Sequence, residues 1–477
     1  MPLPIVVWFR RDLRLSDHPA LVEAAKTGRP IIPLYILEDD EKNSWADGAA
    51  SKWWLHQSLE ALSKSLEQLG GRLYLRRGSP QKVLTDVIQS SGAKSLYWSR
   101  CYEPYAINRD KSIKSFFVEA NFDVKSFNSN LLFEPWEIQT ADGSPYRVFT
   151  PYWKSCLKLW NDRRPLLSQY PMTFYEGNLS SDILESWALC PQKKWADGFK
   201  DMWCPGETGA QDRLNDFISN RLKSYVHDRD KPGLDGTSRL SPHLHWGEIS
   251  PIAIITAIES AMASDSTLKE GGEKFLSELG WREFSHHLLY YFPTLPEQNF
   301  QSKFDHFEWQ SDEKDFLEKW QRGKTGYPIV DAGMRELWKT GWMHNRVRMI
   351  VASFLTKHLR IHWRRGEEWF WDTLVDADLA HNAASWQWVA GSGADAAPYF
   401  RIFNPILQGE RFDPDGDYVR QWVPELAELP SAYIHKPWCA PATILNNCHI
   451  VLGQNYPMPI VDHQVARKYS LDKFKKL

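Results

Sequence analysis

The first 130 residues alternate short apolar runs with amphipathic segments, and no other feature of the chain constrains its fold as strongly. The apolar runs predict strands at residues 5–9, 30–37, 72–78, 95–98 and 124–127. The segments between them have apolar residues at helical spacing and predict helices at 18–26, 53–69, 81–89 and 106–120. Strands and helices that take turns indicate a doubly wound parallel sheet with helices on both faces.

This regularity ends near Phe133. The stretch that follows is rich in Pro, Gly, Asp and Trp, and we expect an irregular connector that packs over the first domain, because its aromatic residues need burial. Farther along, the apolar spacing is helical and β-branched alternation is scarce. The sequence therefore predicts an α/β N-terminal domain at 1–132, an interdomain connector at 133–208 and an all-α domain at 209–477.

Composition and charge exclude several classes of protein. The six cysteines include no C-x-x-C pair, which disfavours a zinc ribbon, a redox pair and a disulfide framework. We expect neither a signal peptide nor a transmembrane segment, and we expect free thiols in a monomeric, cytoplasmic protein. The formal net charge of −3 means that a nucleic-acid partner must meet a local basic surface.

Two motifs suggest chemistry that their context does not support. Gly391, Gly393 and Ala396 satisfy G-x-G-x-x-A, but a dinucleotide fingerprint follows a strand, whereas this one follows helical sequence. Asp376 and Asp378 form an Asp-x-Asp pair, yet no third carboxylate or histidine stands at a usual ligand spacing. We expect neither a Rossmann site nor a metal site.

Two helix faces in the C-terminal half mix charged and aromatic side chains. One carries Glu278, Trp281 and Arg282 at i, i+3 and i+4, and the other carries Trp342, Asn345, Arg346 and Met349. Such faces could line a pocket that stacks a base-like ligand, or they could be ordinary amphipathic helices with buried indoles.

The turn at residues 235–241 precedes a helix and carries hydroxyl groups. Its free N–H groups suit an anion such as pyrophosphate, and a capped helix start would explain the same residues.

The segments resemble the DNA photolyase and cryptochrome family over nearly the whole chain, most closely the bacterial photolyases related to plant cryptochromes. The resemblance is carried by VVWFRRDLRLSDHPAL, DGTSRLSPHLHWGEIS, ELGWREF, GKTGYPIVDAGMRELWKTGWMHNRVRM, DADLAHNAASWQWVAGSGADAAPYFRIFNP and YPMPIVDH. It implies light-dependent repair of cyclobutane pyrimidine dimers by a carbon–carbon lyase, with an electron passing from excited reduced FAD to a flipped-out dimer.

The resemblance also implies which residues hold FAD. Those expected to contact it are Tyr225, Thr237, Ser238, Arg239, Leu240, Ser241, Phe275, Arg348, Asp376, Asp378 and Asn382. Arg348 and Asp376 would pair beside the flavin ring, and Asn382 would face flavin N5. An amide at this position, where plant cryptochromes have an aspartate, favours a fully reduced flavin and repair over signalling.

On the DNA side, the resemblance implies that Glu278 hydrogen-bonds the thymine carbonyls, where negative charge grows. The other residues expected to contact DNA or the lesion are Arg229, Trp281, Arg282, Trp342, Asn345, Arg346, Met349 and Gln408. In relatives that repair (6-4) photoproducts, a histidine pair stands where this chain has Asn345 and Met349. That pair performs acid–base chemistry that Asn and Met cannot, so (6-4) repair is disfavoured.

Two further expectations come from the resemblance. Trp386, Trp363 and Trp309 would pass electrons to photoexcited flavin, and Glu38 would contact an antenna chromophore, either methenyltetrahydrofolate or a deazaflavin. The competing functions are a cryptochrome-type blue-light photoreceptor without repair activity and a light-independent flavin oxidoreductase.

Overall fold

The computed structural model describes residues 2–38, 45–160, 164–166, 170–191, 194–310, 314–395 and 400–477. The chain divides into two compact units. The first unit comprises Met1–Lys193, Trp203–Lys223 and Ser238–Pro293, and the second comprises Lys194–Met202, Ser224–Thr237 and Thr294–Leu477. This division does not coincide with the three segments 1–132, 133–208 and 209–477, which stay a prediction about domain organisation.

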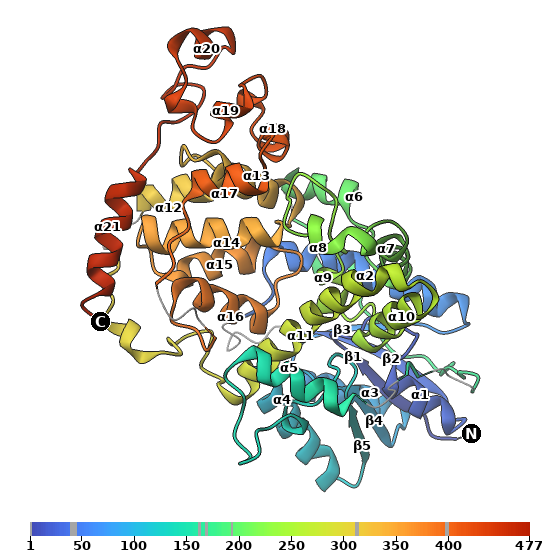
Figure 1. Cartoon of the computed structure of the whole chain (residues 1–477). Helices are drawn as coiled ribbons and strands as arrows, with labels where there is room; N and C mark the ends of the chain where they lie inside the picture. The colour runs from blue at the N-terminus through green and yellow to red at the C-terminus, as the bar shows by residue number, and fades with distance from the viewer. Residues whose placement is uncertain are drawn as a thin grey trace. The chain divides into compact units, whose positions relative to one another are not determined.

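The first unit contains a five-stranded parallel sheet with strand order β3-β2-β1-β4-β5 (Figure 1). The strands are β1 Ile5–Phe9, β2 Ile31–Leu37, β3 Tyr74–Arg77, β4 Ser95–Ser99 and β5 Asp123–Phe127. In the register, Ile5 pairs with Ile31 on one side and with Ser95 on the other. The predicted parallel sheet and its strand positions are confirmed.

Helices cover both faces of this sheet, as the alternation predicted. Val6 and Trp8 of β1 share a buried cluster with residues of α3 and α4. Phe9, which points to the other face, lies 4.9 Å from His18, the N-cap of α1. All of β1 is buried, as expected for a parallel strand covered on both sides.

The remaining elements of the first unit are helices. They are α1 Pro19–Lys26, α2 Ala49–Gln68, α3 Pro80–Ser91, α4 Pro104–Glu119, α5 Phe149–Leu159, α7 Glu207–Asn220, α9 Ser241–His245, α10 Pro251–Ser264 and α11 Lys269–Tyr291. Helix α5 corrects the expectation of an irregular connector. It buries Phe149, Tyr152 and Cys156 at helical spacing, and Pro151 fits because it stands in the first turn, where no N–H partner is lost.

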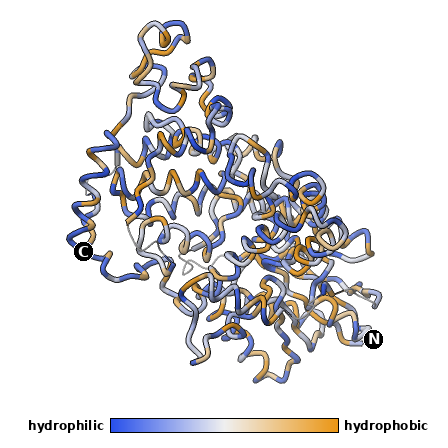
Figure 2. Tube along the Cα trace, viewed as in Figure 1, coloured by the Kyte–Doolittle hydropathy of each residue, from blue (hydrophilic) through white to orange (hydrophobic). Residues whose placement is uncertain are grey.

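In the described residues of the second unit, the regular elements are helices, and one isolated β-bridge joins Leu452 and Tyr456. Its helices are α6 Phe199–Met202, α8 Tyr225–Asp228, α12 Lys314–Gln321, α13 Pro328–Thr340, α14 Asn345–Ser353, α15 Trp363–Thr373, α16 Leu379–Ala390, α17 Pro405–Phe412, α18 Asp417–Trp422, α19 Ser431–Ile434, α20 Ala442–Asn447 and α21 His463–Phe474. A π-helical turn at Phe354–His358 follows α14. Hydrophobic and hydrophilic residues alternate along these helices (Figure 2).

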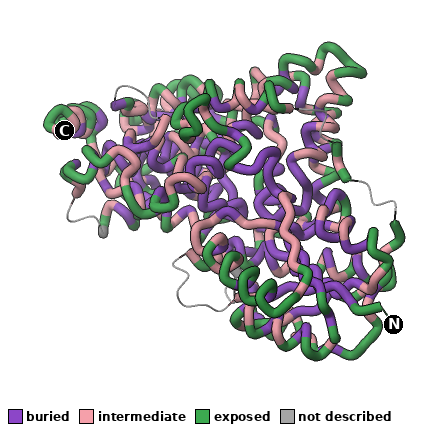
Figure 3. Tube along the Cα trace, turned by 90° about the horizontal axis from the view of Figure 1, so that it is seen from below, coloured by how far each residue is buried: buried purple, intermediate pink, exposed green. Residues whose placement is uncertain are grey.

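The core of the second unit is formed by one large cluster that includes Trp320, Trp363 and Trp386. Buried residues gather inside each unit and exposed residues cover the outer helices (Figure 3). Gly391 ends α16 in the left-handed region, so its G-x-G segment follows a helix as expected, whereas Ala396 lies outside the described residues. In the parts of the chain that the structure describes, no helix combines the length and apolar character that a membrane span requires.

Candidate functional site

An ion pair in the second unit joins two of the residues expected near a flavin. Arg348 of α14 donates from one terminal nitrogen to both carboxylate oxygens of Asp376, at 3.0 and 2.8 Å. Its Nε donates to the Met343 carbonyl at 2.8 Å, which fixes the guanidinium plane. Charge-assisted hydrogen bonds of this kind are stronger than those between neutral groups. The pairing of Arg348 with Asp376 is therefore present, and its role toward a flavin stays a prediction.

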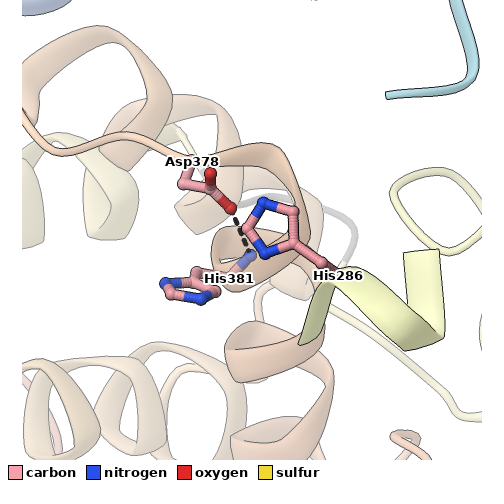
Figure 4. Close-up of side chains that lie close together, drawn as sticks. All are labelled: His286, Asp378 and His381. Atoms are coloured by element: carbon pink, nitrogen blue, oxygen red, sulfur yellow. Dashed lines mark hydrogen bonds between the residues drawn. The ribbon is translucent and has the colours of Figure 1, made fainter. Parts of the chain in front are cut away.

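Asp378 and Asn382 stand on successive turns at the start of α16. Asp378 is the N-cap and accepts a hydrogen bond from the backbone N–H of His381 at 3.0 Å (Figure 4). Asn382 is 8% exposed, and its Nδ2 donates to the main-chain oxygen of Glu367 at 2.9 Å. Because a carbonyl oxygen can only accept, this bond fixes the orientation of the amide. Among the described residues, the Asn382 side-chain oxygen has no protein partner.

Glu367 is a residue that sequence reasoning missed. It is 0% exposed, and neither of its carboxylate oxygens has a hydrogen-bond partner among the described residues. Burial raises its pKa well above the usual range for glutamate, with Arg364 opposing the shift. Burial therefore favours the neutral form of this carboxyl group, and the main-chain oxygen of the same residue accepts from Asn382. In the sequence, Glu367 stands in the charged run RRGEE, which gives no sign of burial.

The three tryptophans expected to carry electrons all lie in the second unit. Trp386 and Trp363 are 2% and 0% exposed, and Trp309 packs against the same core cluster. His362 contacts both Trp309 and Trp363, with ring centroids 4.9 and 5.5 Å apart. Gly366 leaves room for Trp386, because a Cβ at this position would collide with the indole. None of the three indoles stacks directly on another within the described residues.

The face with Trp342, Asn345, Arg346 and Met349 lies at the turn before α14 and along its first two turns. Trp342 is 6% exposed. Arg346 is held in place by an ion pair with Asp230 at 2.9 Å and by the ring of Phe412 at 4.4 Å. Both interactions order a guanidinium that the resemblance assigns to DNA.

A cavity of about 550 Å³ opens beside Arg346 in the second unit. It is lined by Arg346, Arg401, Ile402, Phe403, Asn404, Leu407, Gln408, Arg411, Phe412, His463, Gln464 and Arg467. Four of these residues are arginines and none is acidic, so the cavity attracts anions. Two residues expected to contact DNA, Arg346 and Gln408, thus lie together. Arg401, Arg411 and Arg467 were missed, because they come from a loop, α17 and α21.

In the first unit, α11 carries Glu278, Trp281 and Arg282. Glu278 pairs with Lys274 at 3.0 Å, and Trp281 is partly exposed. Arg282 is 7% exposed and donates to the Asn130 carbonyl at 2.6 Å. This buried guanidinium ties α11 to the segment that follows β5. Its expected contact with DNA stays a prediction.

The residues expected at the FAD phosphates are divided between the two units. In the second unit, Tyr225 is buried and lies 5.5 Å from the guanidinium of Arg229, and Thr237 is the last residue of this segment. In the first unit, Ser238, Arg239, Leu240 and Ser241 form the turn into α9. The N-cap of α9 is Leu240, which makes no side-chain capping bond, and the Ser238 hydroxyl accepts from the Leu240 N–H at 3.4 Å. Phe275 of α11 packs on Phe217, with centroids 4.6 Å apart.

Glu38 directly follows β2 and belongs to a cluster of charged side chains at the carboxyl edge of the sheet. It forms an ion pair with Arg109 and accepts a hydrogen bond from Tyr105 at 3.4 Å. The guanidinium groups of Arg10 and Arg109 lie over the Trp8 ring, at 4.4 and 5.1 Å. The strand order reverses between β1 and β4, and ligands of doubly wound sheets bind at such a point.

Comparison with known proteins identifies the class to which this site belongs. The family described as DNA photolyase matches residues 5–169, and the FAD binding domain of DNA photolyase matches residues 275–476. With the relatives below, these matches show that the chain belongs to the DNA photolyase and cryptochrome family.

Among its relatives, the chain is 52% identical to the deoxyribodipyrimidine photo-lyase of Agrobacterium fabrum, over 98% of this chain and 97% of that protein. It is 40% identical to cryptochrome-2 of Arabidopsis thaliana, over 97% of this chain and 77% of that protein. The crystal structure of a bacterial class III photolyase from Agrobacterium tumefaciens matches with a TM-score of 0.94 at 50% identity, and covers 100% of this chain and 98% of that one.

Proposed function

We propose that this protein repairs cyclobutane pyrimidine dimers in DNA by light-driven electron transfer from reduced FAD. The carrying observation is the orientation of Asn382. Its Nδ2 is committed to the Glu367 carbonyl, so the oxygen is the group left to meet a ligand. An oxygen can accept from the N5–H of a reduced flavin, whereas the N5 of an oxidised flavin needs a donor. The site therefore favours the redox state that repair requires.

The residues of the chain fit FAD in charge and in chemistry. We propose that Arg348 and Asp376 hold the flavin ring, with Asn382 at N5, and that Tyr225 and residues 237–241 hold the phosphates. When bound, reduced FAD would supply the electron after excitation by light. Glu367 is buried without a hydrogen-bond partner for its carboxyl group among the described residues, and burial raises its pKa, which disfavours a negative charge near an electron-rich ring.

On the DNA side, Glu278 would hydrogen-bond the dimer and stabilise the negative charge that it acquires. Lys274, 3.0 Å from Glu278, holds this carboxylate in place until DNA arrives. Trp281 and Trp342 would stack against the pyrimidines, with Asn345 and Met349 along their edge. Neither of the latter two residues moves protons at neutral pH, which supports dimers over (6-4) photoproducts as substrate.

The arginine-lined cavity supports DNA as the partner. We propose that Arg346, Arg401, Arg411 and Arg467 contact phosphates of the strand that carries the lesion. Arg229 would add a further contact. The absence of disulfides among the six cysteines fits the reducing cytoplasm that we propose for this protein, and nothing in the repair chemistry requires more than a monomer.

We also propose an antenna chromophore in the first unit, at the carboxyl ends of β1, β2 and β4. The Nε of Arg10 is buried there without a hydrogen-bond partner among the described residues, beside Trp8 and the Glu38–Arg109 pair. An aromatic ring and unsatisfied cationic nitrogens suit a flat acidic molecule such as a methenyltetrahydrofolate, with a deazaflavin as the alternative. An absorption band in the near ultraviolet, lost in Arg10→Gln, would support this site.

The second candidate function is a blue-light photoreceptor, which the relationship to a plant cryptochrome brings into consideration. One experiment separates the two. Reduced protein is mixed with an oligonucleotide that contains one thymine dimer, and the dimer is quantified chromatographically after blue light and after darkness. Loss of the dimer in light alone supports repair. A dimer that survives illumination with bound, reduced FAD would leave the photoreceptor as the function.

The variant Glu278→Ala, compared with the wild type in the same assay, tests the role of this carboxylate. It should bind FAD as well as the wild type and repair several-fold fewer dimers per absorbed photon, because a negative charge on the dimer then lacks its hydrogen bond. Equal repair by both proteins would remove Glu278 from the mechanism.

A further inference from the structure

Trp281 is one half of a stacked pair within the first unit. The ring of Phe149 lies parallel to the indole, with centroids 3.7 Å apart and an angle of 11° between the planes. Phe149 is the first residue of α5, in the connector, and is 8% exposed. One face of the Trp281 indole is therefore already occupied by a residue that is distant in sequence.

A third ring packs against both members of this pair. Phe284, one turn after Trp281, meets both Phe149 and Trp281 edge-on at 6.0 Å. Tyr152, one turn after Phe149, contacts Phe284 with centroids 5.2 Å apart. The buried Phe149 ring cannot turn without displacing Phe284, because buried side chains are closely packed.

A glycine makes the stacking possible. A Cβ at Gly280 would lie 2.6 Å from a ring carbon of Trp153 in α5, closer than packed atoms approach. Helix α5 therefore packs against α11 at a distance that excludes a side chain at position 280. Trp281 is the next residue along α11, and the same close approach places Phe149 flat against it.

No second ring of the described residues stacks on the opposite face of the indole. Among the described residues, Phe149 and Phe284 are the rings that contact Trp281, and Phe284 meets its edge. Trp281 is partly exposed, whereas Phe149 and Phe284 are buried. The stacked pair thus presents one aromatic surface outward from a rigid support.

We propose that Phe149 is a positioning residue for lesion recognition, which holds the Trp281 indole in the plane that stacks on the pyrimidine dimer. This inference rests on the proposed function. A side chain that is ordered before binding loses little conformational freedom on binding, so Phe149 increases affinity for the lesion without touching it. Undamaged DNA has no flipped dimer to stack on the indole, so the ordering of Trp281 does not increase its affinity.

The test measures how strongly the holoenzyme prefers a duplex with one thymine dimer over the same duplex without it. Phe149→Leu and Phe149→Met remove the planar ring, and each should reduce this preference roughly three- to tenfold, the range that an aromatic pair contributes. Repair per bound dimer at saturating DNA should stay unchanged, so that KM rises and kcat does not. Phe149→Tyr keeps the ring and should retain the preference of the wild type.

Tyr152→Leu is the matched control, because it removes a buried aromatic residue of the same helix that does not contact Trp281. It should destabilise the fold and leave the preference for the dimer within about twofold, since the stacked pair remains intact. Bound FAD and the melting temperature of each variant are measured first. Phe149→Met fills most of the space of the ring, so the test stands even if Phe149→Leu does not fold.

The outcomes separate this inference from the proposed function. A wild-type protein that shows no preference for the dimer would contradict the proposed function itself. If Trp281→Ala loses the preference but Phe149→Leu and Phe149→Met retain it, the inference about Phe149 is wrong and the function stands. An equal loss in Tyr152→Leu would also overturn the inference, because the effect would then be general destabilisation.

Discussion

The side-chain amide of Asn382 donates to the main-chain oxygen of Glu367 at 2.9 Å, and this bond joins α16 to α15. The relationship fixes which end of the amide remains free. Glu367, which supplies the accepting oxygen, is itself buried, and burial raises the pKa of its carboxyl group.

Asn382→Asp should impair the fully reduced state of the flavin. A carboxylate at 382 has no hydrogen to donate to the Glu367 carbonyl, so the side chain must turn or take up a proton. We expect fully reduced flavin to accumulate several-fold more slowly under blue light with an external reductant, as measured by absorbance. Asn382→Gln, which keeps an amide, serves for comparison. Equal rates in wild type and Asn382→Asp would contradict the assigned role of the amide.

Glu367 should make the protein less stable as the pH rises. Below its usual pKa of about 4.5, both the folded and the unfolded states keep the proton on Glu367. Above this pH the unfolded state releases the proton, whereas the folded state retains it because its pKa is raised. The free energy of unfolding therefore falls with pH, by up to about 1.4 kcal/mol per pH unit.

Thermal unfolding between pH 5 and pH 8 tests this pH dependence. The melting temperature of Glu367→Gln should rise relative to that of the wild type as the pH increases. Glu368→Gln, in which the replaced neighbour is an exposed partner of Arg365, should follow the wild type. Parallel curves for wild type and Glu367→Gln would show that the buried carboxyl is ionised.

Trp386→Phe should stop photoreduction and spare repair. A phenyl ring fills most of the indole space but is much harder to oxidise, so we expect photoreduction to slow at least tenfold, with chemically reduced enzyme still repairing dimers. Absorbance under blue light follows the first reaction and dimer chromatography the second. Trp422→Phe, which replaces another indole packed on the same core, is the control. Photoreduction that survives in Trp386→Phe would reveal a different route.

Arg467→Ala should weaken binding of DNA with and without the lesion to a similar degree. Arg467 lines the basic cavity, and losing one phosphate contact should reduce the slope of log affinity against log salt by about one. Fluorescence anisotropy at several salt concentrations measures the slope. Lys475→Ala removes one positive charge from the same helix at an exposed position paired with Asp472. It should leave the slope unchanged, and a similar change in both variants would indicate general electrostatics.

The fold was predictable because its signals are local. Each strand of the parallel sheet is a short apolar run, and the helices between them carry periodic apolar faces that end at Gly70 or Gly92. Helix α5 was missed because its stripe of Phe149, Tyr152 and Cys156 lies in a stretch dominated by Pro and Gly. The C-terminal helices were predictable as a class, although not in their packing.

The sequence predicted which site residues share one helix face, and the family resemblance suggested their roles. It did not predict the contacts between segments that are far apart in the chain. Nothing in the sequence shows that Arg282 bonds to the Asn130 carbonyl, that Glu367 is buried without a partner, or that Arg467 lies near Arg346. These depend on packing between helices far apart in the chain, which local periodicity does not encode.

Gly366 limits which residue this position of α15 can carry. A Cβ at Gly366 would collide with the Trp386 indole, which also packs against Trp320 and Phe370, so the ring would have to shift. If Trp386 passes electrons to the flavin, as the resemblance implies, Gly366→Ala should slow the recovery of reduced flavin after oxidation and leave repair by reduced enzyme intact.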